Sequence, residues 1–503
     1  MKTLRLILGD QLNINHSWFS EVNPNVMYVM AEMRQETNYV KHHIQKVVAF
    51  FLSMRNFAQE LQAKGHEVVY FKISDATNLH DLEKIILNCI EKHQIKQFEY
   101  QLPDEYRLDE QLKNIRADLN INSRFFETEH FYTSRNELTN FFEGKKLLLM
   151  ESFYRMMRKK HDVLMYGMQP EGNQWNYDKD NRLKYKGQVP VPNAIIFKKN
   201  IKGVIEEIEK AGISTFGNID IASYSWPTSR KECLEQLDYF CEKLLLHFGD
   251  YEDASHSDEK FLFHSRLSFA MNSKMVSPKE VNDKVINYYY ENKDTITLSQ
   301  VEGFVRQILG WREYVRGIYW KEMPNYSKMN ALENYNKLPN FYWTGNTKMN
   351  CMQKAISQSL EEAYAHHIQR LMIIGNFSLL TQIHPDEVDA WYLGVYIDAI
   401  EWVEMPNTRG MSQYADGGIM ATKPYVSSGS YINKMSNYCS DCQYNVKERL
   451  GENACPFNSL YWNFLDDKRP QLANNFRMKM MYSVLNKFSN EELNSMKTRA
   501  LQV

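Results

Sequence analysis

Four of the seven cysteines in the sequence have the spacing of ligands to an inorganic centre. Cys439 and Cys442 form a CxxC pair, twelve residues separate that pair from Cys455, and Cys351 lies far upstream. A CxxC pair places two thiolates on one metal centre, and two further cysteines complete fourfold ligation. Zinc accepts the same ligands, and the spacing alone barely separates the two, although Cys455-Pro456 and the single distant cysteine favour an iron–sulfur cluster. Four unrelated buried cysteines are the other reading of this pattern.

The rest of the sequence indicates a reducing compartment for these thiols. The other three cysteines are scattered, which leaves an odd total of seven. The opening MKTLRLILGD lacks the apolar core of a signal peptide, and no apolar run approaches the roughly 18 residues of a membrane span. We therefore expect a cytoplasmic protein that does not enter a membrane, in which clustered cysteines are metal ligands rather than disulfides.

A short string of hydroxyl and basic residues could bind a phosphate group. Residues 263–268 read FHSRLS, and VSP follows at 276–278. Closely spaced hydroxyls and an arginine at the start of a predicted helix suit a pyrophosphate, because a helix N-terminus presents free N–H groups. Serine caps are common, so this string alone is also typical of an ordinary helix start.

Two helical strings carry further polar groups. Residues 310–314 read GWREY, and Gln307 shares a helical face with Trp311 because the two are four residues apart. Residues 366–370 read HHIQR, and Asp398 follows. As isolated strings they are also typical of a core tryptophan with an ion pair and of a capped or core histidine, so their neighbours must decide.

The composition allows a large core and leaves nucleic-acid binding open. Of the 503 residues, 43% are hydrophobic and 24% are charged, which excludes a disordered chain. Lysine and arginine number 60 against 62 acidic residues, so any basic footprint for nucleic acid must be local. Aromatic residues reach 13%, which fits a protein that stacks planar groups or one with a bulky core.

The first 130 residues alternate apolar strands with amphipathic helices. Strands are expected at 4–8, 26–30, 67–73, 97–102 and 124–127, with helices at 39–64, 79–93 and 105–117. This alternation predicts a five-stranded parallel sheet with helices on both faces, a Rossmann-like α/β domain over residues 1–130.

Ligands of such sheets bind outside the carboxyl ends of the strands. Asp10 and Gln11 follow the first expected strand, and Glu32 and Glu36 follow the second. The sequence holds no GxGxxG or Walker motif, which argues against a conventional dinucleotide or triphosphate site in this domain. A small planar ligand held by carboxylates fits the pattern.

Beyond residue 130 the pattern changes twice. Residues 131–205 are an expected interdomain connector, because the stretch 171–193 is polar, non-periodic and contains Gly and Pro. From residue 206 onward apolar residues recur three and four apart. We therefore expect an all-α domain over residues 206–503.

Together these strings resemble the photolyase/cryptochrome superfamily over nearly the whole chain. The SRLS…VSP string resembles the segment that wraps the FAD phosphates in that family. WREY at 311–314 resembles the family's WREF motif beside the lesion pocket, and HHIQR with Asp398 resembles its Arg–Asp pair under the isoalloxazine. The resemblance implies an α/β antenna-binding domain followed by an all-α FAD-binding domain.

The four cysteines resemble those of one branch, the iron–sulfur bacterial cryptochromes and photolyases, also called prokaryotic (6-4) photolyases. This resemblance implies a [4Fe–4S] cluster on Cys351, Cys439, Cys442 and Cys455. It also implies a 6,7-dimethyl-8-ribityllumazine antenna in the N-terminal domain, near Asp10, Gln11, Glu36 and Tyr39. The FAD-binding residues that it implies are His264, Ser265, Arg266, Leu267, Ser268, Gln307, Arg312, Arg370, Asp398 and Glu404.

The chemistry implied by the family is light-driven repair of (6-4) pyrimidine–pyrimidone photoproducts in UV-damaged DNA, by electron transfer from reduced FAD. His367 matches the lesion-side histidine and would act as a general acid, a task that a pKa near neutrality suits. Glu404 would face flavin N5 and tune its protonation, while Arg370 with Asp398 would stabilise the flavin. The lumazine would pass its excitation to the flavin.

The resemblance also assigns apolar and aromatic residues. Trp311, Leu371, Met411 and Tyr425 would line the lesion pocket, with Tyr425 also close to the chemistry. Animal (6-4) enzymes have a second histidine where this chain has Leu371, so a single histidine must serve here. The candidates for photoreduction of the flavin are Trp343, Trp391 and Tyr392.

We expect a monomer that binds DNA phosphates through cations near the pocket, namely Arg306, Arg312, Arg316 and Lys423. The main alternative is a blue-light photoreceptor cryptochrome that signals through flavin reduction without repairing DNA. A second alternative from another class is a non-catalytic DNA-binding protein with a structural cluster, which the flavin motifs disfavour.

Overall fold

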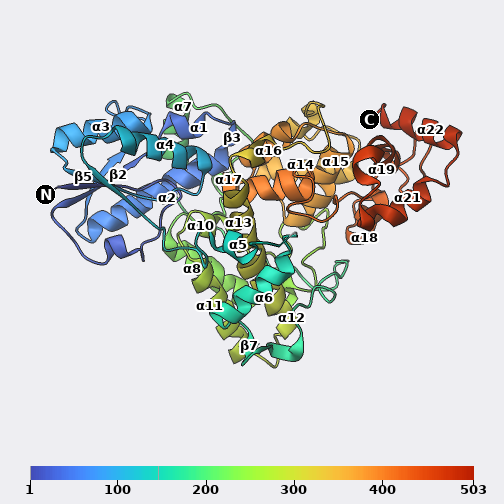
Figure 1. Cartoon of the computed structure of the whole chain (residues 1–503), viewed down its shortest axis with the longest axis horizontal. Coiled ribbons are helices and arrows are strands. Elements are labelled where there is room, and N and C mark those ends of the chain that lie inside the picture. The colour runs from blue at the N-terminus through green and yellow to red at the C-terminus, as the bar shows by residue number, and fades with distance from the viewer. Residues whose placement is uncertain (1, 146) are drawn as a thin grey trace.

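A five-stranded parallel sheet organises the N-terminal part of the chain (Figure 1). The computed structural model describes residues 2–145 and 147–503, and its strand order is β4-β2-β1-β5-β6. The strands are β1 (Thr3–Leu6), β2 (Val26–Ala31), β4 (Glu67–Phe71), β5 (Gln97–Gln101) and β6 (Asn122–Phe126). All four pairings are parallel, which confirms the predicted fold class, and the strand order reverses between β1 and β5.

Helices cover both faces of the sheet, because alternate residues of each strand point to opposite sides. Tyr28 and Met30 of β2 pack in one cluster with the buried face of α2 (Ile44–Ala63). The intervening β2 residues pack with α3 (Leu82–His93) and α4 (Tyr106–Asp118). Burial on both faces explains why the strands appear in the sequence as continuous apolar runs.

The rest of the chain is helical apart from two-residue strands, as predicted. The longer helices are α6 (Met150–His161), α7 (Lys202–Lys210), α8 (Arg230–Tyr239), α11 (Pro278–Glu291), α12 (Leu298–Val305), α13 (Glu313–Glu322), α14 (Asn350–Glu362), α16 (Pro385–Val395), α19 (Pro456–Asp467) and α22 (Asn490–Ala500). Shorter helices include α1 (Arg34–Thr37), α5 (Glu137–Phe141), α9 (Leu245–Phe248), α10 (Ser268–Asn272), α15 (Asn376–Leu380), α17 (Glu401–Met405), α18 (Gly429–Met435), α20 (Arg469–Leu472) and α21 (Lys479–Leu485). The short strands are β3 (His42–His43), β7 (Met165–Tyr166), β8 (Gln169–Pro170) and β9 (Thr215–Phe216). No helix in residues 2–145 or 147–503 is long and apolar enough to cross a membrane.

Wide π-helical turns mark the places where the predicted site residues lie. The described chain has four such segments, η3 (Phe240–Leu244), η4 (Arg306–Arg312), η7 (Gln369–Gly375) and η8 (Pro406–Ser412). A π turn spreads one extra residue over the helix and is frequent at functional sites. Three of the four carry predicted residues: Gln307, Trp311 and Arg312 in η4, Arg370 and Leu371 in η7, and Met411 in η8.

The expected connector has a structured first half. Helix α6 packs through fully buried Phe153, Tyr154 and Met157 in the same apolar cluster as the helical part. Tyr154 also donates to Glu302 Oε1 at 2.9 Å. Between η2 (Glu171–Asn173) and α7 the described chain has no regular element, which suits a connector. The domain limits themselves stay a prediction.

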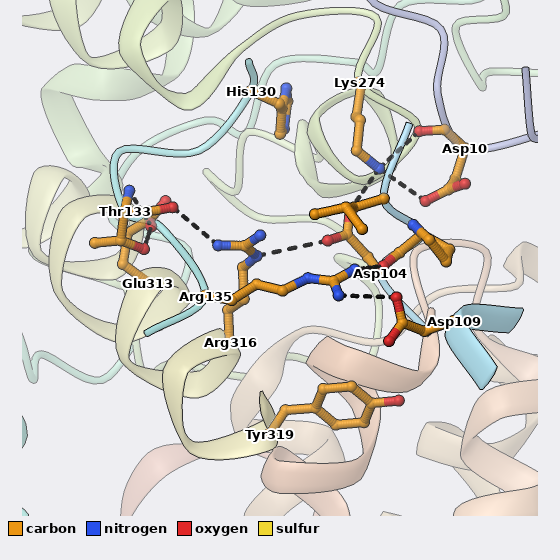
Figure 2. A network of polar contacts seen from close by, with 12 residues as sticks. Asp10, Asp104, Asp109, His130, Thr133, Arg135, Lys274, Glu313, Arg316 and Tyr319 are labelled. Carbon is orange, nitrogen blue, oxygen red and sulfur yellow. Dashed lines mark hydrogen bonds and ion pairs between the residues drawn. The ribbon is translucent and has the colours of Figure 1, made fainter. Parts of the chain in front are cut away.

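A buried lysine from the helical part joins the carboxyl edge of the sheet (Figure 2). The Lys274 Nζ lies 2.7 Å from Asp10 Oδ2 and 2.8 Å from Asp104 Oδ2. Arg316 adds a longer contact, 3.5 Å from its Nε to Asp104 Oδ1, and donates to the Thr133 carbonyl at 2.9 Å. Because Asp10 and Asp104 follow β1 and β5, this ion network fixes the edge of the sheet against the helices.

Removing the Lys274 charge should destabilise the fold. Lys274→Met leaves buried Asp104 and half-buried Asp10 without their shared cation, so the free energy of unfolding should fall by about 3–5 kcal/mol. The matched control is Lys279→Met, because the Lys279–Asp283 pair is exposed and should contribute little. Urea unfolding followed by circular dichroism measures both variants. An equal decrease in both variants would contradict a structural role for the buried lysine.

Candidate functional site

An arginine–aspartate pair forms the centre of the candidate site. Arg370 of η7 donates from both terminal nitrogens to the Asp398 carboxylate, at 2.9 Å and 3.2 Å. Ser268 Oγ donates to the same carboxylate at 2.6 Å, and Asn272 Nδ2 donates to the Asp398 carbonyl at 2.7 Å. Burial alone would raise the pKa of Asp398, but the Arg370 charge outweighs burial and holds that pKa below its usual value. The predicted pair is therefore formed, and the FHSRLS string contributes Ser268 to it.

The same string contains a buried cation. Arg266 is 5% exposed and has a φ of 55°, in the left-handed region that a bulky residue adopts at a cost. Its Nη1 donates to Ser225 Oγ at 3.0 Å, and its guanidinium lies over the rings of Phe261 and Trp226. Burial lowers the pKa of Arg266 to about 10. No carboxylate in the described chain forms a salt bridge with it, so its charge is available to an anion.

The other members of the string have local partners. The two ring nitrogens of His264 each lie 3.1 Å from a backbone carbonyl, and Leu267 is fully buried. The Ser265 hydroxyl accepts from the Leu267 amide at 3.4 Å. Ser277, in the VSP string, caps α11 in a reciprocal box with Glu280. The Ser277 hydroxyl thus serves its own helix, while phosphate binding by His264, Ser265 and Leu267 stays a prediction.

Glu404 is a buried carboxyl with a free oxygen. It lies in α17, is 6% exposed, and its Oε1 has no hydrogen-bond partner in the described structure. Burial and then the charge of Asp389 raise the pKa of Glu404 well above its usual value. This raised pKa favours the neutral form of the carboxyl, which can donate a hydrogen bond to a ligand.

The two adjacent histidines have different environments. His366 is buried and stacks on His264 with ring centroids 4.6 Å apart, whereas His367 is exposed. Desolvation by the surrounding protein, then the charges of Arg370 and His264, lower the pKa of His367 to about 4. The expectation of a pKa near neutrality is therefore wrong for the chain without ligands, because desolvation and then the Arg370 guanidinium disfavour the charged ring.

The predicted lesion-pocket residues belong to one apolar cluster. Trp311, Leu371, Met411 and Tyr425 all pack in it, and they come from η4, η7, η8 and the segment before α18. Leu371 and Met411 are buried, while Trp311 and Tyr425 are half-buried and keep accessible ring surface. The cluster brings the four residues into one body of side chains, and their contact with a lesion stays a prediction.

Two of the three predicted electron-transfer aromatics are in ring contact. The centroids of Trp391 and Tyr392 lie 5.4 Å apart, and the Tyr392 hydroxyl donates to the Arg370 carbonyl at 2.6 Å. Tyr396 packs against Tyr392 and lies 3.8 Å below the Arg370 guanidinium carbon, a position that the sequence pattern did not reveal. Trp343 is 40% exposed, and no ring contact within the described chain joins it to these residues.

The four cysteines of the sequence pattern converge. Cys351 lies in the first turn of α14, Cys455 caps α19, and all four thiols line one pocket with Cys439 and Cys442. Burial, then the neighbouring thiolates, raise the pKa of Cys351 well above its usual value. In the described residues, no three His, Cys, Asp or Glu side chains are placed to hold a single metal ion.

A glycine leaves room beside these thiols. A Cβ on Gly429 would lie 2.7 Å from Cys455 Sγ and 3.0 Å from Val446 Cγ2, closer than side chains approach. The absence of a side chain at Gly429 therefore allows the Cys455 sulfur to take its position.

At the carboxyl edge of the sheet, two of the predicted antenna residues have structural partners. Asp10 pairs with Lys274, as described above. Gln11 is 1% exposed; its Oε1 accepts from the Leu8 amide at 3.0 Å and its Nε2 donates to the Gln101 carbonyl at 3.1 Å. Gln11 thus ties the end of β1 to the end of β5, and contact of either residue with an antenna stays a prediction.

The other two predicted antenna residues converge on an arginine that the sequence pattern did not reveal. Arg107 donates to both oxygens of Glu36, at 3.1 Å and 2.7 Å, and its guanidinium lies 4.6 Å from the Tyr39 ring. Glu105 and Glu401 lie nearby, and burial followed by the charge of Glu401 raises the pKa of Glu105 to about 8. In the sequence, only the position of Glu105 and Arg107 after the fourth expected strand could have indicated them.

Three of the cations expected to bind DNA phosphates are buried instead. Arg306, Arg312 and Arg316 are 6%, 8% and 2% exposed. Arg306 pairs with Glu302 and Asp178, and Arg316 lies in the ion network of Figure 2. That part of the prediction is wrong, because these guanidiniums are held by carboxylates, carbonyls and aromatic rings inside the protein. Lys423 is half-buried and stays a prediction.

Arg312 and Gln307 were also predicted to bind the flavin. Arg312 Nη2 donates to Asn272 Oδ1 at 3.1 Å and to the Met271 carbonyl at 3.3 Å, and its guanidinium lies over Phe131 and Trp402. It therefore supports Asn272, which in turn holds Asp398. Gln307 Nε2 donates to the half-buried Glu252. Direct contact of either residue with a cofactor stays a prediction.

Several known proteins are similar to this chain. The family model described as "Deoxyribodipyrimidine photo-lyase-related protein" matches residues 5–224. A relative named (6-4) photolyase, from Agrobacterium fabrum, is 41% identical over 503 residues, which is 99% of this chain and 98% of the relative. An uncharacterised protein, R853, of Acanthamoeba polyphaga mimivirus is 37% identical over 115 residues, which is 22% of this chain and 84% of that protein.

Solved structures show the same fold at low sequence identity. A bacterial class III photolyase from Agrobacterium tumefaciens matches with a TM-score of 0.61 at 13% identity, over 100% of this chain and 96% of that one. A cryptochrome from Synechocystis matches with a TM-score of 0.57 at 14% identity, over 99% and 94% of the two chains. The full-length relative and the family model together show that this chain belongs to the deoxyribodipyrimidine photolyase-related family, that of the bacterial (6-4) photolyases.

Proposed function

We propose that this chain is a light-dependent (6-4) photolyase, which repairs pyrimidine–pyrimidone photoproducts in UV-damaged DNA. The observation that carries the proposal is the bidentate pair between Arg370 and Asp398, three residues from the exposed His367 in a chain whose full-length relative bears that name. The pair fixes a negative carboxylate and a positive guanidinium at one place, and the histidine offers a titratable group beside them.

Membership of this family implies FAD, and the residues of the site fit that cofactor. Arg266 offers a buried charge for a phosphate, and Arg370 offers a fixed guanidinium for the ring system. Glu404 offers a carboxyl whose raised pKa favours its neutral form, and its Oε1 lacks a partner in the described structure. In its reduced and light-excited form FAD supplies the electron for repair.

The chain itself would handle position and protons. Asp398 holds Arg370 in one orientation, and Ser268 and Asn272 hold Asp398 in turn. Protonated Glu404 would donate from its carboxyl oxygen to flavin N5. His367 would hand a proton from its ring nitrogen to the lesion, once the negative charges of the cofactor and the DNA raise its pKa. Trp391, Tyr392 and Trp343 would carry electrons to the flavin during its photoreduction.

The thiol pocket offers the ligands that a [4Fe–4S] cluster needs. All four thiols line one pocket. A cubane cluster binds each of four thiolates to a different iron. Zinc could use the same ligands, and the cluster is favoured by the family to which the chain belongs. We assign Cys351, Cys439, Cys442 and Cys455 to that cluster.

The carboxyl edge of the sheet fits a small polar antenna such as 6,7-dimethyl-8-ribityllumazine. Buried polar atoms there have no partner in the described structure: both amide atoms of Gln101, both ring nitrogens of His42 and the Nε of Arg107. Unsatisfied groups of this kind indicate a ligand with several heteroatoms. Glu36 and Tyr39 lie beside them and would contact it.

The DNA backbone would bind along α6 rather than at the buried arginines. Arg155, Lys159 and Lys160 are exposed on this helix and line one open hollow. Arg155 and Lys159 also lie near the face of Trp175. The segment after Trp175 reaches the lesion-pocket side, because Asp178 pairs with Arg306 of η4. This face therefore presents cations to phosphates next to the pocket.

Illumination with a (6-4)-containing oligonucleotide tests the function. Holoenzyme with fully reduced FAD should remove the photoproduct in light and not in darkness, and the repair rate of His367→Ala should fall at least 100-fold, the scale expected when a general acid is removed. His93→Ala, which changes a half-buried histidine at the end of α3 and away from the flavin site, is the control. No repair by the wild type would sink the proposal and leave the photoreceptor alternative. Full repair by His367→Ala would sink the proton-donor role alone.

The titration of His367 gives a separate check on the electrostatics of the site. In the flavin-free chain its ring should titrate near pH 4 and be neutral at pH 7, because Arg370 and desolvation disfavour the charged form. A lowered pKa in the folded chain also means that this histidine opposes folding as the pH falls below about 6.5. NMR of selectively labelled histidine, assigned with His367→Gln, measures the midpoint. A midpoint at or above 6.5 would contradict the account.

A side chain at Gly429 should disturb the cluster. Gly429→Ala places a methyl group against Cys455 Sγ, so bound iron per chain and the iron–sulfur absorbance should both fall. Gly203→Ala is the control, because a Cβ there meets no atom within 4 Å. Unchanged iron content in Gly429→Ala would show that this position of the Cys455 sulfur is not the metal-binding one.

Neutralising the α6 face should weaken DNA binding in a salt-dependent way. Lys159→Ala with Lys160→Ala should lower the slope of log affinity against log salt by about 0.9 for each phosphate that the variant no longer neutralises. Lys497→Ala is the control, because it lies in α22, at the C-terminal end of the molecule and apart from α6 (Figure 1). Equal slopes for wild type and the double variant would exclude this face from the DNA footprint.

A further inference from the structure

The segment that leads into the CxxC pair forms hydrogen bonds with two other segments of the chain, one of which leads into Arg370. On one side the Ser255 amide donates to the Met435 carbonyl at 3.0 Å. The Ser257 amide donates to Asn437 Oδ1 at 2.9 Å, next to it. On the other side Gln369 Nε2 donates to the Tyr438 hydroxyl at 3.0 Å. Residues 435–438 therefore lie between the thiol pocket and the two segments that contain Ser255 and Gln369.

Tyr438 belongs to both regions. It directly precedes Cys439, is 1% exposed, and lines the thiol pocket together with the four cysteines. Its carbonyl accepts from Asn350 Nδ2 at 2.8 Å, and Asn350 directly precedes Cys351. The backbone of Tyr438 is thus fixed next to two of the thiols, while its hydroxyl reaches η7.

Gln369 receives that contact and is fixed in its turn. It is 2% exposed, its Oε1 accepts from the His366 amide at 3.1 Å, and its Nε2 also donates to Gln358 Oε1 at 2.9 Å. Gln369 is the first residue of η7 and directly precedes Arg370. A displacement of its amide must therefore move the start of the π segment that carries the guanidinium.

The contacts close into a loop. The His366 Nε2 lies 3.0 Å from Ser255 Oγ, and Ser255 returns through its amide to Met435. The path Tyr438–Gln369–His366–Ser255–Met435 begins and ends in the same short segment, and its side chains are buried. Because these groups are buried, water cannot replace a hydrogen bond that one of them loses. A displacement of one member should therefore displace the others.

We propose that Tyr438 and Gln369 are positioning residues that couple the four-thiol centre to Arg370 and to the histidine pair. The proposal deepens the proposed function and rests on its flavin and cluster. A change in the charge of the four-thiol centre displaces residues 435–438. The hydrogen bond between Tyr438 and Gln369 passes this displacement to the Gln369 amide, and η7 moves with it. Because coupling between two sites is reciprocal, a change at the flavin must also be felt at the thiols.

Resonance Raman spectra of the holoenzyme test this reciprocity. The iron–sulfur stretching bands are recorded with the flavin oxidised and with the flavin fully reduced. In the wild type the bands should shift between the two states, and in Tyr438→Phe the shift should disappear while the bands themselves remain. Tyr444→Phe is the matched control, because Tyr444 lines the same pocket and no hydrogen bond from its hydroxyl is present in the described chain. It should keep the wild-type shift.

A second variant removes the same contact from the other end. Gln369→Met keeps the length of the side chain and removes its donor, so it should also abolish the shift, whether or not Tyr438→Phe loads iron fully. A shift that persists in either variant, a shift that is absent in the wild type, or a wild type without iron would overturn the coupling. Repair measured on the same wild-type sample separates the two proposals: repair without a band shift overturns the coupling alone, and a band shift without repair overturns the function alone.

Discussion

The buried ammonium of Lys274 is the contact on which the arrangement of the two halves depends. It lies within 2.8 Å of carboxylates that follow β1 and β5, and it comes from the helical segment just after the FHSRLS string. The charges of Lys274 and Asp104 are buried and costly to desolvate, so the network adds little net stability but strongly penalises other arrangements. It thereby fixes the sheet edge, where the antenna is proposed to bind, against the segment that holds Asp398.

The short helix α17 connects the proposed antenna site at the sheet edge to the flavin site. Glu401 and Glu404 both lie in α17, and the first faces Glu105 at the sheet edge while the second is the buried carboxyl of the flavin site. Lys46 of α2 donates to the carbonyls of Leu393 and Ala399, which bracket the chain just before α17. The two proposed chromophore sites are therefore held at a fixed separation by short, buried elements, as transfer of excitation requires.

The sequence predicted what depends on local pattern. The apolar runs indicated the five strands because both faces of the sheet are covered, and the CxxC spacing identified thiols that do converge. The Arg370–Asp398 pair came from the family resemblance and not from spacing. The ion pairs of Lys274 could not be predicted, because its partners are 170 or more residues away and no neighbouring residue indicates them. The burial of Arg306, Arg312 and Arg316 could not be predicted for the same reason, because a cation in a motif does not indicate the groups that folding places around it. The π turns have no sequence signature, yet they place Trp311, Arg370 and Met411.

In the proposed mechanism, repair depends on light absorbed by the flavin and by the antenna, which the fold holds at a fixed separation. Its most direct measurement is the action spectrum of photoproduct loss, the rate of removal of a (6-4) lesion from an oligonucleotide as a function of wavelength. The mechanism predicts a spectrum with the band of reduced flavin and a second band from the antenna at the sheet edge, and no removal in darkness. Absence of photoproduct removal at every wavelength, with the flavin fully reduced and the oligonucleotide bound, would contradict it.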